Sequence, residues 1–307
     1  MSFSRPGIKV IPALLLIGVT AIWGWTFVVV KAAVARYPVV SFLGVRFLLA
    51  ALILWLIVVL VREKAPVARA GFAIGLVLAL SYLLQTLGLK RTSVANTGLI
   101  TGLFVVFTPI IDRLAWRVPS RKDAWLAALV AFAGTALLTG GAPTGLHFGD
   151  LLVLLGSVGF ALHITLLSRY AAGGPLLLAA WQMTAAGATL AAGALATRST
   201  ILPVPAAVLP AIAITGIFAS ALAFWVQTYA QQRLPASRAA LILTMEPAFT
   251  VFFAFLLVGE RFGLLQALGA ALILGALFYS EMHGRYADPR AAGAGPPGPI
   301  VERSPVR

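Results

Sequence analysis

Three ionisable residues lie inside long apolar runs of this sequence. Glu246 occurs in LILTMEPAFTVFFAFLLVGER (241–261), Arg46 in FLGVRFLLAALIL (42–54), and His163 within the apolar run 150–169. A charged side chain at the centre of a membrane helix costs about 2.5–3.5 kcal/mol on insertion scales. Because each such residue carries this cost, all three are candidates for binding a solute or moving a proton.

Each of these residues has a functional and a structural interpretation. Glu246 could couple to protons or contact a substrate ammonium group, or it could hydrogen-bond the carbonyl that Pro247 leaves unpaired. Arg46 could bind a carboxylate bidentately, or extend along its helix to the interface. His163 could relay protons or line a cavity, or it could be a neutral buried side chain with a satisfied hydrogen bond.

Further polar and aromatic side chains in the apolar runs are candidates for a solute cavity. The polar ones could equally form hydrogen bonds between helices, worth about 0.6 kcal/mol each, and the aromatic ones could form interfacial belts. These candidates are Thr26, Gln85, Asn96, Thr101, Gln182, Gln227, Trp25, Tyr82, Trp225 and Tyr229. Pro109 and Pro247 are predicted to break helices, because proline has no N–H to donate.

The composition indicates that a lipid bilayer surrounds most of the chain. Of its 307 residues 61% are hydrophobic and only 10% are charged, and the mean hydropathy is +0.99. A soluble domain would have about 25% charged residues. The net charge of +14 is explained by basic cytoplasmic loops rather than by nucleic acid. The absence of cysteine excludes disulfides and Cys-ligated metals, and no metal or cofactor is predicted.

The apolar runs predict an all-α membrane protein with ten spans, since a span needs about 20 apolar residues. The spans are expected at 10–33, 39–61, 70–89, 94–111, 123–140, 150–169, 175–197, 205–230, 236–258 and 263–281. Residues 1–9 would form a cytoplasmic N-terminus. Residues 282–307, rich in Pro, Gly and Arg, would form a disordered cytoplasmic tail.

The basic residues predict the orientation of these spans. Most of the 23 Lys and Arg residues fall on the side that holds both termini, and Arg46 lies inside a span. The other side holds Lys31, Arg36, Lys90, Arg91, Arg198 and Arg261. Both termini are therefore expected in the cytoplasm. The preference for Arg over Lys, with abundant Ala, Leu and Gly, favours a bacterial inner membrane.

The two halves of the chain, 10–140 and 150–281, resemble each other. Gln85-Thr86 recurs as Gln227-Thr228, and Pro109 recurs as Pro247. Because each half has five spans, the second half would be inverted relative to the first. Inverted repeats are typical of secondary transporters, whose substrate site lies at mid-membrane between the repeats. The pattern predicts alternating access around a central cavity.

Four stretches also resemble the EamA-type transporters of the drug/metabolite transporter superfamily. They are AIWGWTFVVVK (21–31), FLGVRFLLAALIL (42–54), TGLITGLFVVFTPII (97–111) and RAALILTMEPAFTVFFAFLLVGERF (238–262). The resemblance implies two inverted five-helix repeats. It also implies movement of small organic solutes such as amino acids, metabolites or drugs, more often outward than inward. The first half departs from the pattern, with Thr108-Pro109 where the second has Glu-Pro, and without the Gly-Glu-Arg end.

Other functions find less support in the sequence. The motif HFGD (147–150) is similar to the GxGD of intramembrane aspartyl proteases, but no second aspartate is placed to act with Asp150, so an enzyme is not expected. A channel usually has charged rings or carbonyl-rich filter loops, which the sequence lacks. A small-solute channel or an importer of the same fold stays as the alternative. The sequence does not indicate the oligomeric state.

Overall fold

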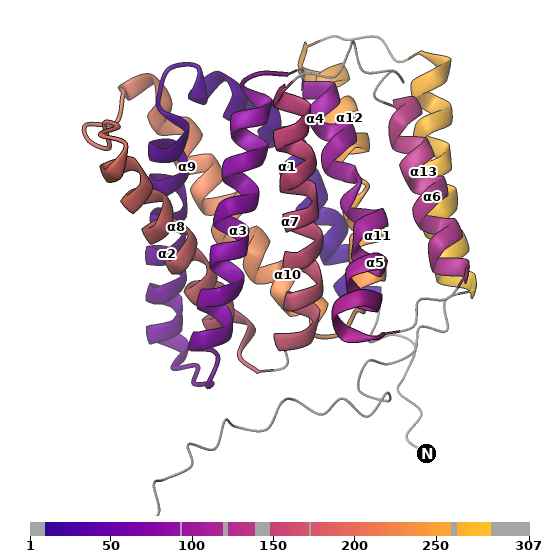
Figure 1. The fold of residues 1–307 in the computed structure, drawn as a ribbon, viewed down its shortest axis with the longest axis horizontal. Helices are drawn as coiled ribbons and strands as arrows, with labels where there is room; N and C mark the ends of the chain where they lie inside the picture. Colours follow the sequence, from indigo (N-terminus) through magenta and orange to yellow (C-terminus); the bar gives the residue numbers. More distant parts are fainter. Residues whose placement is uncertain are drawn as a thin grey trace, which may run out of the picture.

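Helices form almost all of the computed structural model, which describes residues 10–92, 94–118, 122–138, 148–171, 173–258 and 263–283. No strand occurs within these residues. The helices stand side by side (Figure 1), with α2, α8 and α9 at one edge and α6 and α13 at the other. The prediction of an all-α protein is therefore confirmed.

The helices in chain order are α1 (Val10–Val34), α2 (Val39–Val61), α3 (Ala68–Leu89), α4 (Val94–Gly102), α5 (Phe104–Trp116), α6 (Lys122–Leu138), α7 (Phe148–Tyr170), α8 (Pro175–Ala196), the 3₁₀ turn η2 (Ala206–Val208), α9 (Leu209–Gly216), the π-helical segment η3 (Ile217–Leu222), α10 (Ala223–Gln231), α11 (Ala236–Leu243), α12 (Glu246–Val258) and α13 (Leu264–His283). The expected tails, 1–9 and most of 282–307, lie outside the described residues.

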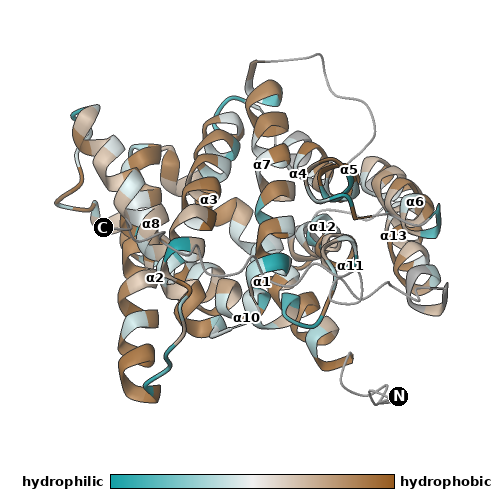
Figure 2. Ribbon diagram, turned by 60° about the horizontal axis from the view of Figure 1, so that its bottom comes forward, coloured by the Kyte–Doolittle hydropathy of each residue, from teal (hydrophilic) through white to brown (hydrophobic). Residues whose placement is uncertain are grey.

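Length and hydropathy identify the chain as a polytopic membrane protein. Among the described residues, seven helical stretches are long and apolar enough to cross a bilayer, and Leu264–Tyr279 is a shorter apolar helix. Hydrophobic residues run along most of the helices (Figure 2). Many large apolar side chains are exposed, such as Leu60 at 81% and Leu114 at 77%. Because soluble proteins rarely expose large apolar patches, a bilayer must cover these faces.

Two of the expected spans are interrupted near their middle. The range 236–258 divides into α11 and α12, and Pro247 is the second residue of α12. Proline is well tolerated there, because the first turn of a helix leaves its N–H groups unpaired. The range 94–111 divides at Leu103, after Gly102, a poor helix former. Pro109 lies inside α5 instead, so the interruption in the first half precedes the proline.

The expected span 205–230 contains a feature that the sequence did not indicate. Residues Ile217–Leu222 form a π-helical segment between α9 and α10. Such segments occur frequently at functional sites. This one packs against α2, and its Ser220 Oγ and Ala219 carbonyl accept hydrogen bonds from Arg46, which lines the cavity described below.

Glycines allow α2 and α8 to approach closely. A Cβ atom on Gly44 would lie 3.1 Å from the backbone N of Ala191, and one on Gly187 would lie 2.8 Å from the backbone N of Leu48. Small residues at helix contacts are typical of membrane proteins, where close packing drives helix association. The close α2–α8 contact fixes the position of α2 and therefore that of Arg46.

Candidate solute-binding site

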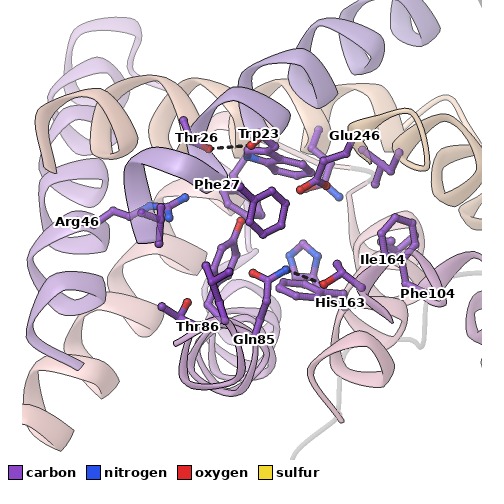
Figure 3. Close-up of a pocket in the computed structure, with 18 residues that line it drawn as sticks. Trp23, Thr26, Phe27, Arg46, Gln85, Thr86, Phe104, His163, Ile164 and Glu246 are labelled. Carbon is purple, nitrogen blue, oxygen red and sulfur yellow. Dashed lines mark hydrogen bonds between the residues drawn. The ribbon is translucent and has the colours of Figure 1, made fainter. Parts of the chain in front are cut away.

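A central cavity lies where α1, α3, α7 and α10 meet the interruption between α11 and α12. Its empty volume is about 660 Å³, which includes space that is open at its mouth. Figure 3 shows Arg46 and Glu246 on opposite sides of the cavity, with Gln85 and His163 at its lower edge. Side chains from both halves of the chain thus enclose one space.

Eight of the candidates named from the sequence line this cavity. They come from seven different helices, and the fold brings them together across up to 220 residues of chain. The eight are Thr26, Arg46, Tyr82, Gln85, Thr101, His163, Gln227 and Glu246. Their roles in transport stay predictions.

Other candidates lie elsewhere. Gln182 is behind His163 and contacts its ring, and the side chain of Asn96 lies outside the described residues. Trp25, Trp225 and Tyr229 do not line the cavity. Trp225 and Tyr229 are each two residues from Gln227, about 200° around the helix, so they face away from it.

The sequence reasoning missed ten lining residues. These are Trp23, Phe27, Val30, Thr86, Leu89, Phe104, Phe160, Ile164, Phe224 and Leu243. Helical periodicity could have found most of them, because residues three, four and seven apart share a face. Trp23 and Val30 follow this spacing around Thr26, and Phe160 lies three residues before His163.

The guanidinium group of Arg46 is held by the protein. Arg46 is only 2% exposed. Its Nε donates to Ser220 Oγ at 2.7 Å, and one terminal nitrogen donates to Ala219 O at 3.3 Å. The Tyr82 and Phe47 rings lie 5.1 and 5.2 Å from its central carbon, within reach of a cation–π interaction. Arg46 therefore joins α2 to the π-helical segment rather than extending to the interface.

The carboxylate of Glu246 has no such partners. Glu246 is the first residue of α12 and is 9% exposed. Its side chain forms no hydrogen bond or ion pair with the described residues, whereas its backbone carbonyl accepts from Thr250 Oγ1 at 3.0 Å. The positive end of the helix dipole favours an anion at this position. The side chain is thus available to a ligand.

His163 belongs to a chain of hydrogen bonds. Its Nε2 lies 2.9 Å from Gln182 Oε1, and Gln182 Nε2 donates to Leu178 O at 3.3 Å and to Thr228 Oγ1 at 3.4 Å. The Phe224 ring stands edge-on to the imidazole, 5.8 Å away. This arrangement orients His163, with a satisfied hydrogen bond, at the wall of the cavity.

Gln85 and Gln227 have different surroundings. Gln85 Nε2 donates to Thr101 Oγ1 at 3.0 Å, and Ser157 Oγ donates to the Thr101 carbonyl at 2.9 Å. Gln227 Nε2 donates to Gln231 Oε1 at 3.0 Å, but Gln227 Oε1 is buried with no hydrogen-bond partner. Gln227 therefore has an unused acceptor, and Gln85 joins α3 to α4.

Comparison with known proteins places the chain in a family. The model of the EamA-like transporter family matches residues 10–140 and 147–281. The chain belongs to this family. Its resemblance to EamA-type transporters is thus confirmed, and transport rather than enzymatic activity is the activity of the family.

Relatives of the EamA protein include several transporters. An uncharacterized transporter of Archaeoglobus fulgidus is 34% identical over 257 residues, covering 83% of this chain and 81% of the relative. The uncharacterized inner membrane transporter YedA of Escherichia coli is 26% identical over 87% of this chain and 89% of its own length. A solved crystal structure shares the fold, with a TM-score of 0.72 at 19% identity over 91% of this chain and 98% of its own.

Proposed function

We propose that this EamA protein is a secondary transporter that moves small organic solutes across the bacterial inner membrane by alternating access, as an exporter. The central cavity supports this proposal, because polar side chains from both halves converge on one cavity at the helix interruptions. The relatives named as transporters support the same activity. Export follows the family resemblance, and an importer or channel of the same fold is the alternative.

We infer ten spans arranged as two inverted repeats, 10–140 and 150–281. The family model matches both halves. In this arrangement α1 corresponds to α7, α2 to α8, α3 to α9–α10, α4–α5 to α11–α12, and α6 to α13. A pseudo-twofold axis between the halves would then give each contact between two non-corresponding helices an equivalent contact elsewhere. One pair of equivalent contacts is α3–α7 with α1–α10, and another is α5–α7 with α1–α12. In the contacts α2–α8 and α6–α13, each helix packs against its own counterpart, as helices beside the axis would. This pattern supports the inverted repeat.

The orientation can be tested with single cysteines, because the chain has none of its own. If both termini are cytoplasmic, Arg36 faces the outside and Lys64 the cytoplasm. A membrane-impermeant maleimide should label Arg36→Cys in intact cells, and Lys64→Cys only after lysis. The reverse labelling pattern would contradict the orientation.

Reconstituted liposomes test the transport proposal directly. We expect saturable uptake and counterflow, in which unlabelled internal solute drives uptake of labelled solute. An imposed pH gradient is expected to accelerate this flux if protons couple through Glu246, and Glu246→Gln should remove that dependence because an amide does not exchange a proton. A current proportional to voltage, without counterflow, would favour a channel.

A further inference from the structure

The lining of the cavity has unused acceptors, while each of several nitrogen donors already has an acceptor. Glu246 has a carboxylate without a partner among the described residues, and Gln227 Oε1 is buried and unpaired. By contrast, Trp23 Nε1 donates to Ala219 O at 2.9 Å, and Gln85 Nε2 donates to Thr101. Buried polar groups normally have hydrogen-bond partners. A ligand that donates hydrogen bonds would supply the missing ones.

The orientation of the Gln227 amide follows from its neighbour. Gln231 Nε2 donates to Ile164 O at 2.8 Å and to Ser168 Oγ at 2.6 Å, which uses both of its hydrogens. Gln231 therefore presents its oxygen to Gln227, and Gln227 must present its nitrogen. The oxygen of Gln227 is left as the free acceptor.

The walls between these acceptors are aromatic. Trp23 and Phe224 rings lie 5.3 Å apart, Tyr82 and Phe160 lie 5.1 Å apart, and Tyr82 and Phe224 lie 6.0 Å apart. Phe27 lies beside Trp23 in the same cavity (Figure 3). Aromatic faces attract cations and bury flat apolar groups.

Arg46 is the cationic side chain in this lining, and the side of its guanidinium that carries Nε is already engaged. Ser220 and Ala219 accept from it, and the Tyr82 and Phe47 rings lie close to it. A substrate carboxylate that approached Nε side-on would have to displace these contacts to form a bidentate pair. The lining thus favours a positive ligand over a negative one.

We propose that the cavity binds an organic cation, with its ammonium group at Glu246, Gln227 Oε1 as a further acceptor, and an aromatic body against Trp23, Tyr82 and Phe224. This inference rests on the proposed transport function, because it names the substrate class of the same cavity. A carboxylate on the ligand is not required for binding.

Equilibrium binding to the purified protein in nanodiscs tests the inference without any transport step. The probes are 2-phenylethylamine and 1-naphthylmethylamine, the neutral counterparts 2-phenylethanol and 1-naphthylmethanol, the anion 3-phenylpropionate, and phenylalanine. We expect the amines to bind at least about tenfold more tightly than the neutral probes, and Glu246→Gln to remove that preference. Phenylalanine should bind no more tightly than 2-phenylethylamine.

Glu63→Gln is the matched control, because Glu63 lies outside the cavity, where it accepts from the backbone N of Leu177. The Glu63→Gln variant should leave amine binding unchanged. For the Glu246→Gln variant, a melting temperature equal to that of the parent protein, measured without ligand, would exclude misfolding. Equal binding of amines and alcohols, tighter binding of phenylalanine or 3-phenylpropionate, or no amine binding would overturn the inference. If the cation inference failed, counterflow of other solutes would still support the proposed transport function. Amine binding without any counterflow would contradict the transport function but not the inference that the cavity binds an organic cation.

Discussion

Gly24→Ala adds a single carbon, but it is expected to slow solute counterflow by about tenfold or more. A tenfold slower rate corresponds to an increase of about 1.4 kcal/mol in the activation free energy. A Cβ atom at Gly24 would lie 2.8 Å from the Glu246 carbonyl oxygen, 2.8 Å from the Thr250 nitrogen and 2.9 Å from Phe249 Cβ. Two of these three atoms belong to the backbone of the first turn of α12, which cannot rotate away. The helix that carries Glu246 must therefore move.

Displacement of the first turn of α12 by Gly24→Ala should lower the rate of transport as well as the stability of the protein. Overpacking typically costs about 1–3 kcal/mol, and here the strain falls on the helix start that positions the carboxylate. The neighbours of Gly24, Trp23 and Thr26, also line the cavity. We expect a lower melting temperature and a lower counterflow rate in liposomes that contain equal amounts of folded protein.

Gly18→Ala provides the matched control on the same helix. A Cβ atom at Gly18 would have nothing within 4 Å. Alanine favours a helix over glycine by about 1 kcal/mol, so this variant should be as stable as the parent or more stable. Equal losses in the Gly18 and Gly24 variants would show that the contact with α12 is not the cause.

The helices could be predicted closely because the bilayer constrains them. A span must be about 20 residues long and apolar, and the backbone must satisfy its hydrogen bonds within the helix. The range 39–61 accordingly coincides with α2, and 150–169 lies within α7. Neither rule concerns neighbouring helices, so hydropathy gave no indication of the π-helical segment.

The interruptions were only partly predictable. Glu-Pro marked the break before α12, because proline is favoured at the start of a helix. Pro109 did not mark the break in the first half, which lies at Leu103. A proline restricts the backbone locally, but where a helix divides also depends on what the freed groups contact, such as Ser157 Oγ donating to the Thr101 carbonyl.

The polar part of the site was more predictable than its aromatic part. Buried polar residues are rare in membrane helices, so Glu246, Arg46 and His163 stood out. Phenylalanine is common here, with 18 residues, so composition did not distinguish Phe224 from the others. The partner of Arg46 was also not predictable, because Ser220 lies 174 residues away and meets it only through tertiary packing.

Arg46→Lys is expected to reduce transport of cationic, neutral and acidic solutes to a similar extent. Lysine lacks the planar fork of arginine, so it does not reproduce the fixed geometry in which Arg46 donates to Ser220 Oγ and Ala219 O. Hydrogen bonds from charged groups contribute about 1.5–3 kcal/mol, and the loss should appear as a lower melting temperature. Flux assays with one solute of each charge class, at equal amounts of folded protein, measure the effect on transport.

Ser220→Ala separates this joining role from direct substrate binding. If Arg46 acts through Ser220, the serine variant should show the same loss in part, and the double variant should lose less than the sum of the two, because residues in contact couple. Selective loss of acid transport in Arg46→Lys, with normal transport in Ser220→Ala, would instead show that the guanidinium binds a substrate carboxylate. The π-helical segment makes the first outcome the expected one, since it places Ser220 and the Ala219 carbonyl against the arginine before any solute arrives.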